Sequence, residues 1–344
     1  MIKLLITDDS VTETMLLKHL FNAEKDMEVI GCAQNGRDAV YLAATLKPDL
    51  ITMDIQMPIM DGYEATKRIM MENPVPIVVI SSTVNNKELN TAFLALEAGA
   101  VSVIDKPVNA RDPRFNVMRQ KLISTIRAMA EIKVIRHRFG KSNIPICFPS
   151  TYPKIPYEII GIGASVGGPQ ALKIILSNLP ENFPVPIVIV QHMAAGFIEG
   201  FCNWLNASCA LTVKCITNQE ELKPGTVYFA PENCHLKVYK AGAKLRGLLQ
   251  QGAPITGFCP SITVLFQSIA QVCGKQAVGI LLTGMGKDGA QGLLELKQKG
   301  AHTLIQDKKS CVVFGMAGFA ESMGAVDKTL ELKQFITYFM QIIS

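Results

Sequence analysis

The sequence predicts two doubly wound α/β domains, each built around a mainly parallel sheet. Three observations lead to this prediction. The 344 residues exceed the length of one ordinary domain. Short apolar runs alternate with segments of helical period in both halves of the chain. Residues 121–156, which contain a run of spaced prolines, interrupt this alternation and are expected to link a domain at 1–120 to a second at 157–344.

The first half is expected to hold five strands, each followed by a polar or acidic residue. They are Lys3–Thr7, Val29–Ala33, Leu50–Met53, Ile77–Ser81 and Val101–Ile104. Apolar residues three and four positions apart predict helices between the strands, and the first helix is expected to use Val11, Met15 and Leu16 as its apolar face. A further amphipathic helix is predicted at Phe115–Ile132.

The second half repeats the alternation with different spacing. Buried parallel strands are predicted at Glu158–Gly163, Val185–Gln191 and Ala277–Thr283. Tyr228–Pro231 and Lys237–Lys240 are expected to form a small antiparallel piece around a turn at Asn233. The last apolar stretch, Phe335–Ile343, has helical period and predicts a helix that packs on the domain.

Composition excludes several classes of protein. A net charge of +5 is too mild to indicate a nucleic-acid partner. The apolar runs are too short to enter a membrane, and Met1–Ile6 is too short for a signal peptide. The nine cysteines include no C-x-x-C pair, which favours reduced thiols over disulfides or zinc. We therefore expect a cytoplasmic protein. A monomer is expected as well.

Charged and polar residues gather at the strand ends of the first domain. Asp8 and Asp9 follow the first strand, Asp54 the third, Ser82 the fourth and Lys106 the fifth. Because parallel strands end at one edge of a sheet, these residues should meet there. Three carboxylates repel one another unless a cation such as Mg²⁺ lies among them, and Lys106 and Ser82 can bind phosphoryl oxygens. This set predicts transient phosphorylation of a carboxylate.

On these residues the first domain resembles the receiver domain of response regulators, which implies a flavodoxin-like five-stranded fold and phosphorylation by a histidine kinase. The resemblance makes Asp54 the phosphoacceptor and Ser82 and Lys106 the switch residues. It also implies that Asp8, Asp9, Asp54 and the carbonyl of Gln56 hold the Mg²⁺ ion. Val103 departs from the pattern, because receivers often have an aromatic residue there.

A glycine-rich turn follows the first strand of the second domain. Ser165 lies in Gly163–Gly168, between a predicted strand and a predicted helix at Gln170–Leu179. A serine at such a turn has an exposed hydroxyl, and the N–H groups of the helix start can stabilise an oxyanion. Glycine-rich turns also bind phosphates, so the motif alone leaves both interpretations open.

Two further strand ends favour catalysis. His192 follows the next strand, and Asp288 lies in the glycine-rich turn after the strand at Ala277–Thr283. Serine, histidine and aspartate at one edge supply a nucleophile, a general base and a group that fixes the tautomer of the base. Their order along the chain differs from that of α/β-hydrolases, so a different scaffold is expected.

With these residues the second domain resembles the CheB family of chemotaxis protein-glutamate methylesterases. The matching stretches are Gly163–Gly168, Gln191–Met193, Leu282–Gly289 and Ser310–Met316. The resemblance implies the triad Ser165, His192 and Asp288, with the backbone N–H of Met285 at the oxyanion. It further implies demethylation of methyl-accepting chemoreceptors with release of methanol, deamidation of certain receptor glutamines, no metal in the ester step, and release of an occluded cleft by receiver phosphorylation.

Two departures and three alternatives accompany this interpretation. Val166 replaces a threonine that is common in the family, and Ile255–Thr263 lacks the charged residues expected there. His235 is interpreted as a loop residue that either touches substrate or forms polar surface. The alternatives are a serine hydrolase of another ester or amide, a non-catalytic phosphorylation-regulated scaffold, and a transcription factor, which the absence of a short helix-turn-helix unit disfavours.

Overall fold

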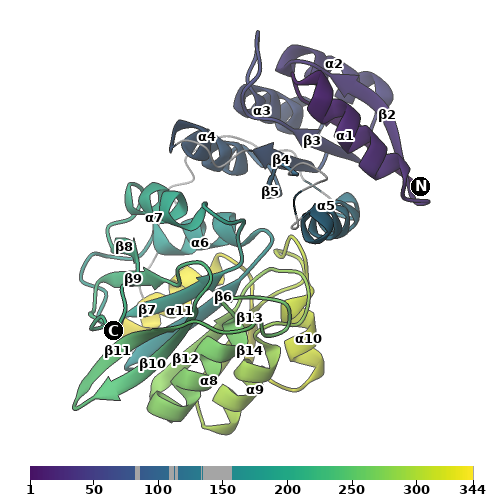
Figure 1. The fold of residues 1–344 in the computed structure, drawn as a ribbon. Helices are drawn as coiled ribbons and strands as arrows, with labels where there is room; N and C mark the ends of the chain where they lie inside the picture. The colour runs from purple at the N-terminus through teal and green to yellow at the C-terminus, as the bar shows by residue number, and fades with distance from the viewer. Residues whose placement is uncertain (82–85, 108–111, 113–114, 133, 135–156, 344) are drawn as a thin grey trace. The chain divides into compact units, whose positions relative to one another are not determined.

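The computed structural model of the protein describes residues 1–81, 86–107, 112, 115–132, 134 and 157–343 (Figure 1). The chain divides into two compact units, Met1–Ser142 and Asn143–Ser344. The division falls within the predicted linker, most of which lies outside the described residues. Helix α5 (Phe115–Ala130) runs across residue 120. The domain limits at 120 and 157 remain predictions.

The first unit is a five-stranded parallel sheet with the order β2-β1-β3-β4-β5 (Figure 1). Its strands are β1 (Ile2–Thr7), β2 (Met27–Ala33), β3 (Leu50–Met53), β4 (Ile77–Ser81) and β5 (Ser102–Asp105). Its helices are α1 (Val11–Asn22), α2 (Gly36–Leu46), α3 (Gly62–Glu72), α4 (Asn86–Glu97) and α5. The five predicted strands are confirmed, each within two residues at either end. In this doubly wound order β1 and β3 are parallel neighbours, so their carboxyl ends lie side by side.

The apolar face predicted for the first helix is wrong. Helix α1 buries Leu17, Leu20 and Phe21, whereas Val11 and Met15 are exposed and Leu16 is half-buried. The buried residues lie in the last two turns, where the helix packs on the sheet. The first turn of α1 instead lies beside the polar strand ends, so its apolar residues have no core to enter.

The second unit contains a seven-stranded sheet in which every neighbouring pair is parallel, with the order β14-β13-β12-β6-β7-β9-β8. The strands are β6 (Ile159–Ala164), β7 (Ile187–Gln191), β8 (Thr212–Cys215), β9 (Thr226–Phe229), β12 (Ala277–Leu281), β13 (His302–Gln306) and β14 (Lys328–Leu330). The helices are α6 (Gly168–Leu176), α7 (Ile198–Asn206), α8 (Ile262–Cys273), α9 (Ala290–Gln298), α10 (Met316–Ser322) and α11 (Gln334–Ile343), with a 3₁₀ turn at Gly274–Gln276.

Two glycines in β6 determine how closely α8 packs on the sheet. A Cβ added at Gly161 would lie 2.7 Å from Ile269 Cδ1, and one at Gly163 would lie 2.3 Å from Ile262 Cγ2. Any larger residue would push α8 away from β6. The glycines therefore place the first residues of α8 over the carboxyl end of the central strands.

The predicted pairing of Tyr228–Pro231 with Lys237–Lys240 is wrong. Tyr228 lies in β9, which joins the main sheet between β7 and β8. The segment at Lys237 lies in β10 (His235–Ala241), which pairs antiparallel with β11 (Lys244–Gln250). Asn233 does form a turn, with a φ of 59°. Tyr228 is 2% exposed, so burial in the larger sheet outweighs the short-range hairpin pattern.

The C-terminal helix α11 packs on the second unit as predicted. Phe335 and Phe339 are fully buried, and the ring of Phe339 meets that of Phe183 edge-on. Within the described part of the chain, none of the helices has both the length and the apolar character that a membrane crossing requires.

Candidate active site

An acidic cluster lies at the carboxyl edge of the first sheet. Carboxylate oxygens of Asp8, Asp9 and Asp54 all lie within 4.8 Å of one another. Lys106 Nζ lies 2.9 Å from Asp54 Oδ2 and 3.1 Å from Asp8 Oδ2. Glu13 of α1 completes the ion pairs of this lysine at 2.7 Å. The strand ends thus bring together four residues predicted from the sequence. Glu13, from the first turn of α1, joins them.

The electrostatics of this cluster fit a divalent cation. Burial and the negative charge of Asp54 raise the pKa of Asp8 to about 6. Burial also raises the pKa of Asp54, although Lys106 opposes that shift. One lysine therefore leaves the carboxylates under-compensated. Oxygen ligands in this arrangement are those that Mg²⁺ prefers, so the residues present fit the ion.

Three other predicted positions of the first unit have different outcomes. Ser82 lies outside the described residues. Gln56 is exposed and follows β3 by three residues, next to the buried turn at Asp54 and Ile55. Val103 is a half-buried residue of β5, so the site has no aromatic side chain there.

The second unit brings its candidate residues to one sheet edge. Ser165 follows β6 and His192 follows the neighbouring strand β7. The His192 backbone N–H donates to Ala164 O at 2.9 Å. The side-chain amide of Gln191 donates through Nε2 to the backbone carbonyls of both Ser165 and His192, at 2.8 Å each. These bonds hold the two backbones in a fixed relation.

The turn at Ser165 depends on close packing by small residues. Gly167 has a φ of +76°, which suits glycine at the start of α6. A Cβ added at Gly284 would lie 2.7 Å from Ser165 Cβ and 2.2 Å from Met316 Cε. The segment after β12 therefore lies directly against the serine. Ser165 itself is 7% exposed.

The carboxylate of Asp288 is fully buried at the N-terminus of α8. Its Oδ1 accepts from the hydroxyls of Ser261 and Thr263, at 2.8 Å each, and from the N–H groups of Thr263 and Gly289. Its Oδ2 accepts from Ile262 N at 2.8 Å and faces His192 Nε2 at 3.0 Å. Asp288 thus caps α8 from a distant part of the chain.

These contacts decide the charge of Asp288. Burial would raise the pKa of this carboxyl, but the hydrogen bond from His192, the attraction of any positive charge on that ring, the Thr263 hydroxyl and the Ile262 N–H outweigh it. The pKa of Asp288 consequently lies well below its usual range. An ionised carboxylate only accepts, so His192 Nε2 carries the hydrogen that it shares with Asp288.

The tautomer leaves the lone pair of His192 on Nδ1. The His192 side chain is 6% exposed. Nδ1 is buried and has no hydrogen-bond partner in the described part of the chain. The ring therefore presents an unoccupied acceptor, and Ser165 Oγ does not donate to it in this structure. Catalytic hydrogen bonds often tighten only when substrate binds.

Donors for an oxyanion lie near the serine. The backbone N–H groups of Val166, Gly167 and Met285 have no acceptor among the described residues. Val166 and Gly167 begin the turn into α6, and Met285 follows Gly284, which packs on Ser165. Met285 has an exposed side chain, so any contribution to the site would come from its backbone.

Sequence reasoning missed the residues that hold the candidate side chains in place. Ser261 and Thr263 bind Asp288, although they stand 27 and 25 residues away from it in sequence. Gln191 was noted only as part of a matching stretch. His235, interpreted as a loop residue, begins β10 and is 4% exposed. A serine at the N-cap of an apolar helix, with Thr263 in the first turn, is the local signal for the Asp288 contacts.

Comparisons with known families match both units. A family model described as CheB methylesterase matches residues 160–338. A model described as response regulator receiver domain matches residues 4–114. The first covers the sheet with Ser165, and the second covers the sheet with Asp54.

Similar proteins extend over nearly the whole chain. A Syntrophus aciditrophicus protein named protein-glutamate methylesterase/protein-glutamine glutaminase 1 is 43% identical over 337 residues, covering 96% of this chain and 95% of its own. A Geobacter metallireducens protein named protein-glutamate methylesterase/protein-glutamine glutaminase 4 is 42% identical, covering 98% and 97%. The crystal structure of the Thermotoga maritima CheB methylesterase catalytic domain is 36% identical, with a TM-score of 0.53, and covers 55% of this chain and all of its own.

Proposed function

The chain belongs to the CheB methylesterase family, and from this membership we propose how it acts on its substrate. It is a phosphorylation-regulated protein-glutamate methylesterase and protein-glutamine glutaminase of chemotaxis signalling. It hydrolyses glutamate 5-O-methyl esters of methyl-accepting chemoreceptors, and it deamidates specific receptor glutamines. The relatives carry both activities in their names, and both family models match this chain, the receiver model at residues 4–114 and the methylesterase model at residues 160–338.

Ser165, His192 and Asp288 are the proposed catalytic residues. Ser165 Oγ attacks the ester carbonyl while His192 Nδ1 accepts its proton, because Nε2 is engaged by Asp288. The developing imidazolium is stabilised by the ionised Asp288. His192 then gives the proton to the departing methoxide, which leaves as methanol. The observation that carries this proposal is the buried Nδ1 acceptor of a ring fixed by Asp288 beside the Ser165 turn.

The second half of the cycle restores the serine. Water attacks the acyl-enzyme, His192 Nδ1 takes the water proton, and the proton returns to Ser165 as the glutamate carboxylate leaves. The N–H of Met285, with those of Val166 and Gly167, is the proposed donor set for both oxyanions. On a glutamine substrate the same steps release ammonia in place of methanol. The ester step needs no metal in this scheme.

The first unit is the proposed control element. Asp54 accepts a phosphoryl group from a histidine kinase, and Lys106 and Ser82 bind the phosphoryl oxygens. Asp8, Asp9 and Asp54, with the backbone carbonyl of Gln56, would hold a Mg²⁺ ion, whose chemistry is to neutralise charge on the phosphoryl oxygens. The carboxylate cluster within 4.8 Å and the raised pKa of Asp8 support this role. The protein is further proposed to act as a cytoplasmic monomer.

A methanol-release assay tests the enzymatic proposal. Membranes carrying methylated receptors are incubated with the wild type and a phosphodonor, and then with Ser165→Ala and with the matched control Ser208→Ala, which removes an exposed hydroxyl of the same unit. We expect Ser165→Ala to lower methanol release by roughly 10³-fold or more and Ser208→Ala to leave it unchanged. Retained activity in Ser165→Ala would assign the reaction to another nucleophile.

A further inference from the structure

An aromatic ring covers one face of the His192 imidazole. The ring centroids of His192 and Phe258 are 3.7 Å apart, and the two planes differ by 4°. The contact with Asp288 fixes the rotation of the imidazole within its plane, since it binds one ring edge. It does not prevent the plane from tilting. The parallel ring of Phe258, at van der Waals distance, restricts this tilt, because a tilted imidazole would overlap Phe258.

Phe258 is presented by a tight turn. Ile255 and Phe258 exchange two backbone hydrogen bonds of 3.0 Å. The two residues between them, Thr256 and Gly257, have φ values of 54° and 88°. Positive φ at both central positions is typical of a type I′ turn, whose twist suits a two-residue hairpin. The turn therefore has a defined shape although residues 251–257 are exposed.

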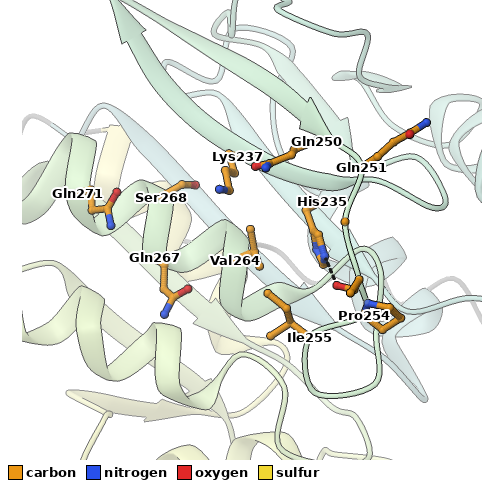
Figure 2. Close-up of a pocket in the computed structure, with 12 residues that line it drawn as sticks. His235, Lys237, Gln250, Gln251, Pro254, Ile255, Val264, Gln267, Ser268 and Gln271 are labelled. Atoms are coloured by element: carbon orange, nitrogen blue, oxygen red, sulfur yellow. Dashed lines mark hydrogen bonds between the residues drawn. The ribbon is translucent and has the colours of Figure 1, made fainter.

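His235 ties this exposed segment to the body of the unit on both sides of the turn. Its Nε2 donates to Ala253 O at 3.0 Å, before the turn (Figure 2). Its Nδ1 accepts from Ser261 N at 3.2 Å, after the turn. The ring is 4% exposed and lines a cavity of about 440 Å³ together with Ile255 (Figure 2). Both nitrogens are used, so the histidine acts as a clamp across the base of the loop.

Ser261 connects His235 to the carboxylate of Asp288. Ser261, whose N–H binds His235, donates its hydroxyl to Asp288 Oδ1 at 2.8 Å. Phe258 covers one face of His192 and Asp288 binds one edge. His235 supports both, because it holds the loop that carries Phe258 and the Ser261 residue that binds Asp288. Phe258 also lines a cavity of about 560 Å³ together with Gly286 and Lys287, which follow Met285 in the chain.

We propose that Phe258 is a positioning residue for the esterase reaction, held in place by the His235 clamp. It keeps the imidazole plane in the orientation from which Nδ1 reaches Ser165, and its π-face stabilises the imidazolium that forms as the proton transfers. This inference rests on the proposed function, because it assigns the stacking to the step that His192 performs there.

Four variants of the full, phosphodonor-activated chain test the proposal. Phe258→Leu keeps an apolar side chain of similar volume but removes the flat face, and Phe258→Tyr restores the face. Ile255→Ala is the matched control in the same turn, since its side chain lines the other cavity. We expect Phe258→Leu to lower kcat roughly 10- to 100-fold with KM within twofold. We expect Phe258→Tyr and Ile255→Ala to stay near wild type, and His235→Ala to lower kcat as Phe258→Leu does.

A second readout does not depend on turnover. The His192 ring protons lie over the face of Phe258 and should show an upfield ring-current shift in the NMR spectrum. Phe258→Leu should remove this shift and Phe258→Tyr should keep it. Wild-type kcat in Phe258→Leu, or a change confined to KM, would overturn the positioning role. Absence of the ring-current shift in the wild type would overturn the stacking itself. Failure of the wild type to release methanol, with the shift present, would instead contradict the proposed function.

Discussion

Substituting Asp288→Asn tests the tautomer on which the mechanism depends. All six hydrogen bonds at this side chain run toward the carboxylate: four to Oδ1, and two to Oδ2 from Ile262 N and His192. An asparagine has one acceptor oxygen, which should take the side with four donors. Its NH₂ group then faces His192, so Nε2 must accept. The ring proton moves to Nδ1, and the lone pair needed for Ser165 is lost.

The expected loss of kcat follows from this change of tautomer. In serine proteases the equivalent change of tautomer lowers kcat by about 10⁴-fold, which corresponds to about 5 kcal/mol. Stability should fall as well, because the buried Ile262 N–H loses its acceptor, at a cost of about 1–3 kcal/mol. For a unit of this size that lowers Tm by roughly 2–12 °C. The Asp288→Asn variant should therefore remain folded and stable enough to assay.

Methanol release from methylated receptors measures the catalytic effect, with thermal unfolding as the check on folding. Ser261→Ala is the matched control, because it removes one donor from Oδ1 and leaves the bond to His192 intact. It should lower kcat less than tenfold. If Asp288→Asn keeps kcat within tenfold of the wild type, or matches Ser261→Ala, the assignment of Nδ1 as the base is refuted.

The charge of Asp288 also predicts how stability depends on pH. Its pKa in the folded protein lies below the ordinary value, so the unfolded chain binds the proton more readily. The stabilisation is therefore complete at neutral pH and is lost as the pH falls below about 4. Asp288→Asn should flatten the loss of stability in that acid range.

Three further predictions concern both units. Asp54→Asn should remove the stimulation of methanol release by a phosphodonor while leaving the basal rate unchanged, and equal stimulation would contradict phosphorylation at Asp54. Mg²⁺ affinity, measured by calorimetry, should fall about tenfold from pH 7 to pH 5, because protons compete for Asp8 once the pH drops below its pKa of about 6; a constant affinity would exclude Asp8 as a ligand. Gly284→Ala should displace Ser165, lowering kcat and costing about 1–3 kcal/mol of unfolding free energy, since its Cβ would lie 2.7 Å from Ser165 Cβ; a wild-type kcat and Tm would show that the turn can relax.

The central parallel strands could be predicted because burial on both faces gives a continuous apolar run. β3 and β4 coincide with their predicted bounds, and polar residues follow directly. The short edge strand β8 (Thr212–Cys215) carries no such run and was missed. β9 pairs with both β7 and β8, but about 35 residues separate it from β7 in sequence, whereas the segment at Lys237 follows it within ten residues and gives the stronger local hairpin pattern. Sheet neighbours far apart in sequence are not encoded in local pattern.

The positions of chemical groups were more predictable than the groups that support them. Ser165, His192 and Asp288 each follow a strand, and strand ends identify an edge without any knowledge of side-chain contacts. The contacts that fix Asp288 come from Ser261 and Thr263, and the ring on His192 comes from Phe258. Phe258 and Ser261 lie in the segment before α8 and Thr263 lies in its first turn, and the strand pattern does not place any of them. Their roles depend on how α8 packs against Gly161 and Gly163, which only coordinates reveal.

The most direct test of the account is to trap the covalent intermediate. The phosphodonor-activated chain is mixed with a methylated receptor peptide, quenched in acid within a turnover, digested, and examined by mass spectrometry. We predict that the peptide holding Ser165 gains the mass of the receptor peptide less methanol, and that Ser165→Ala gives no adduct. Methanol release together with an adduct on another residue would contradict the account.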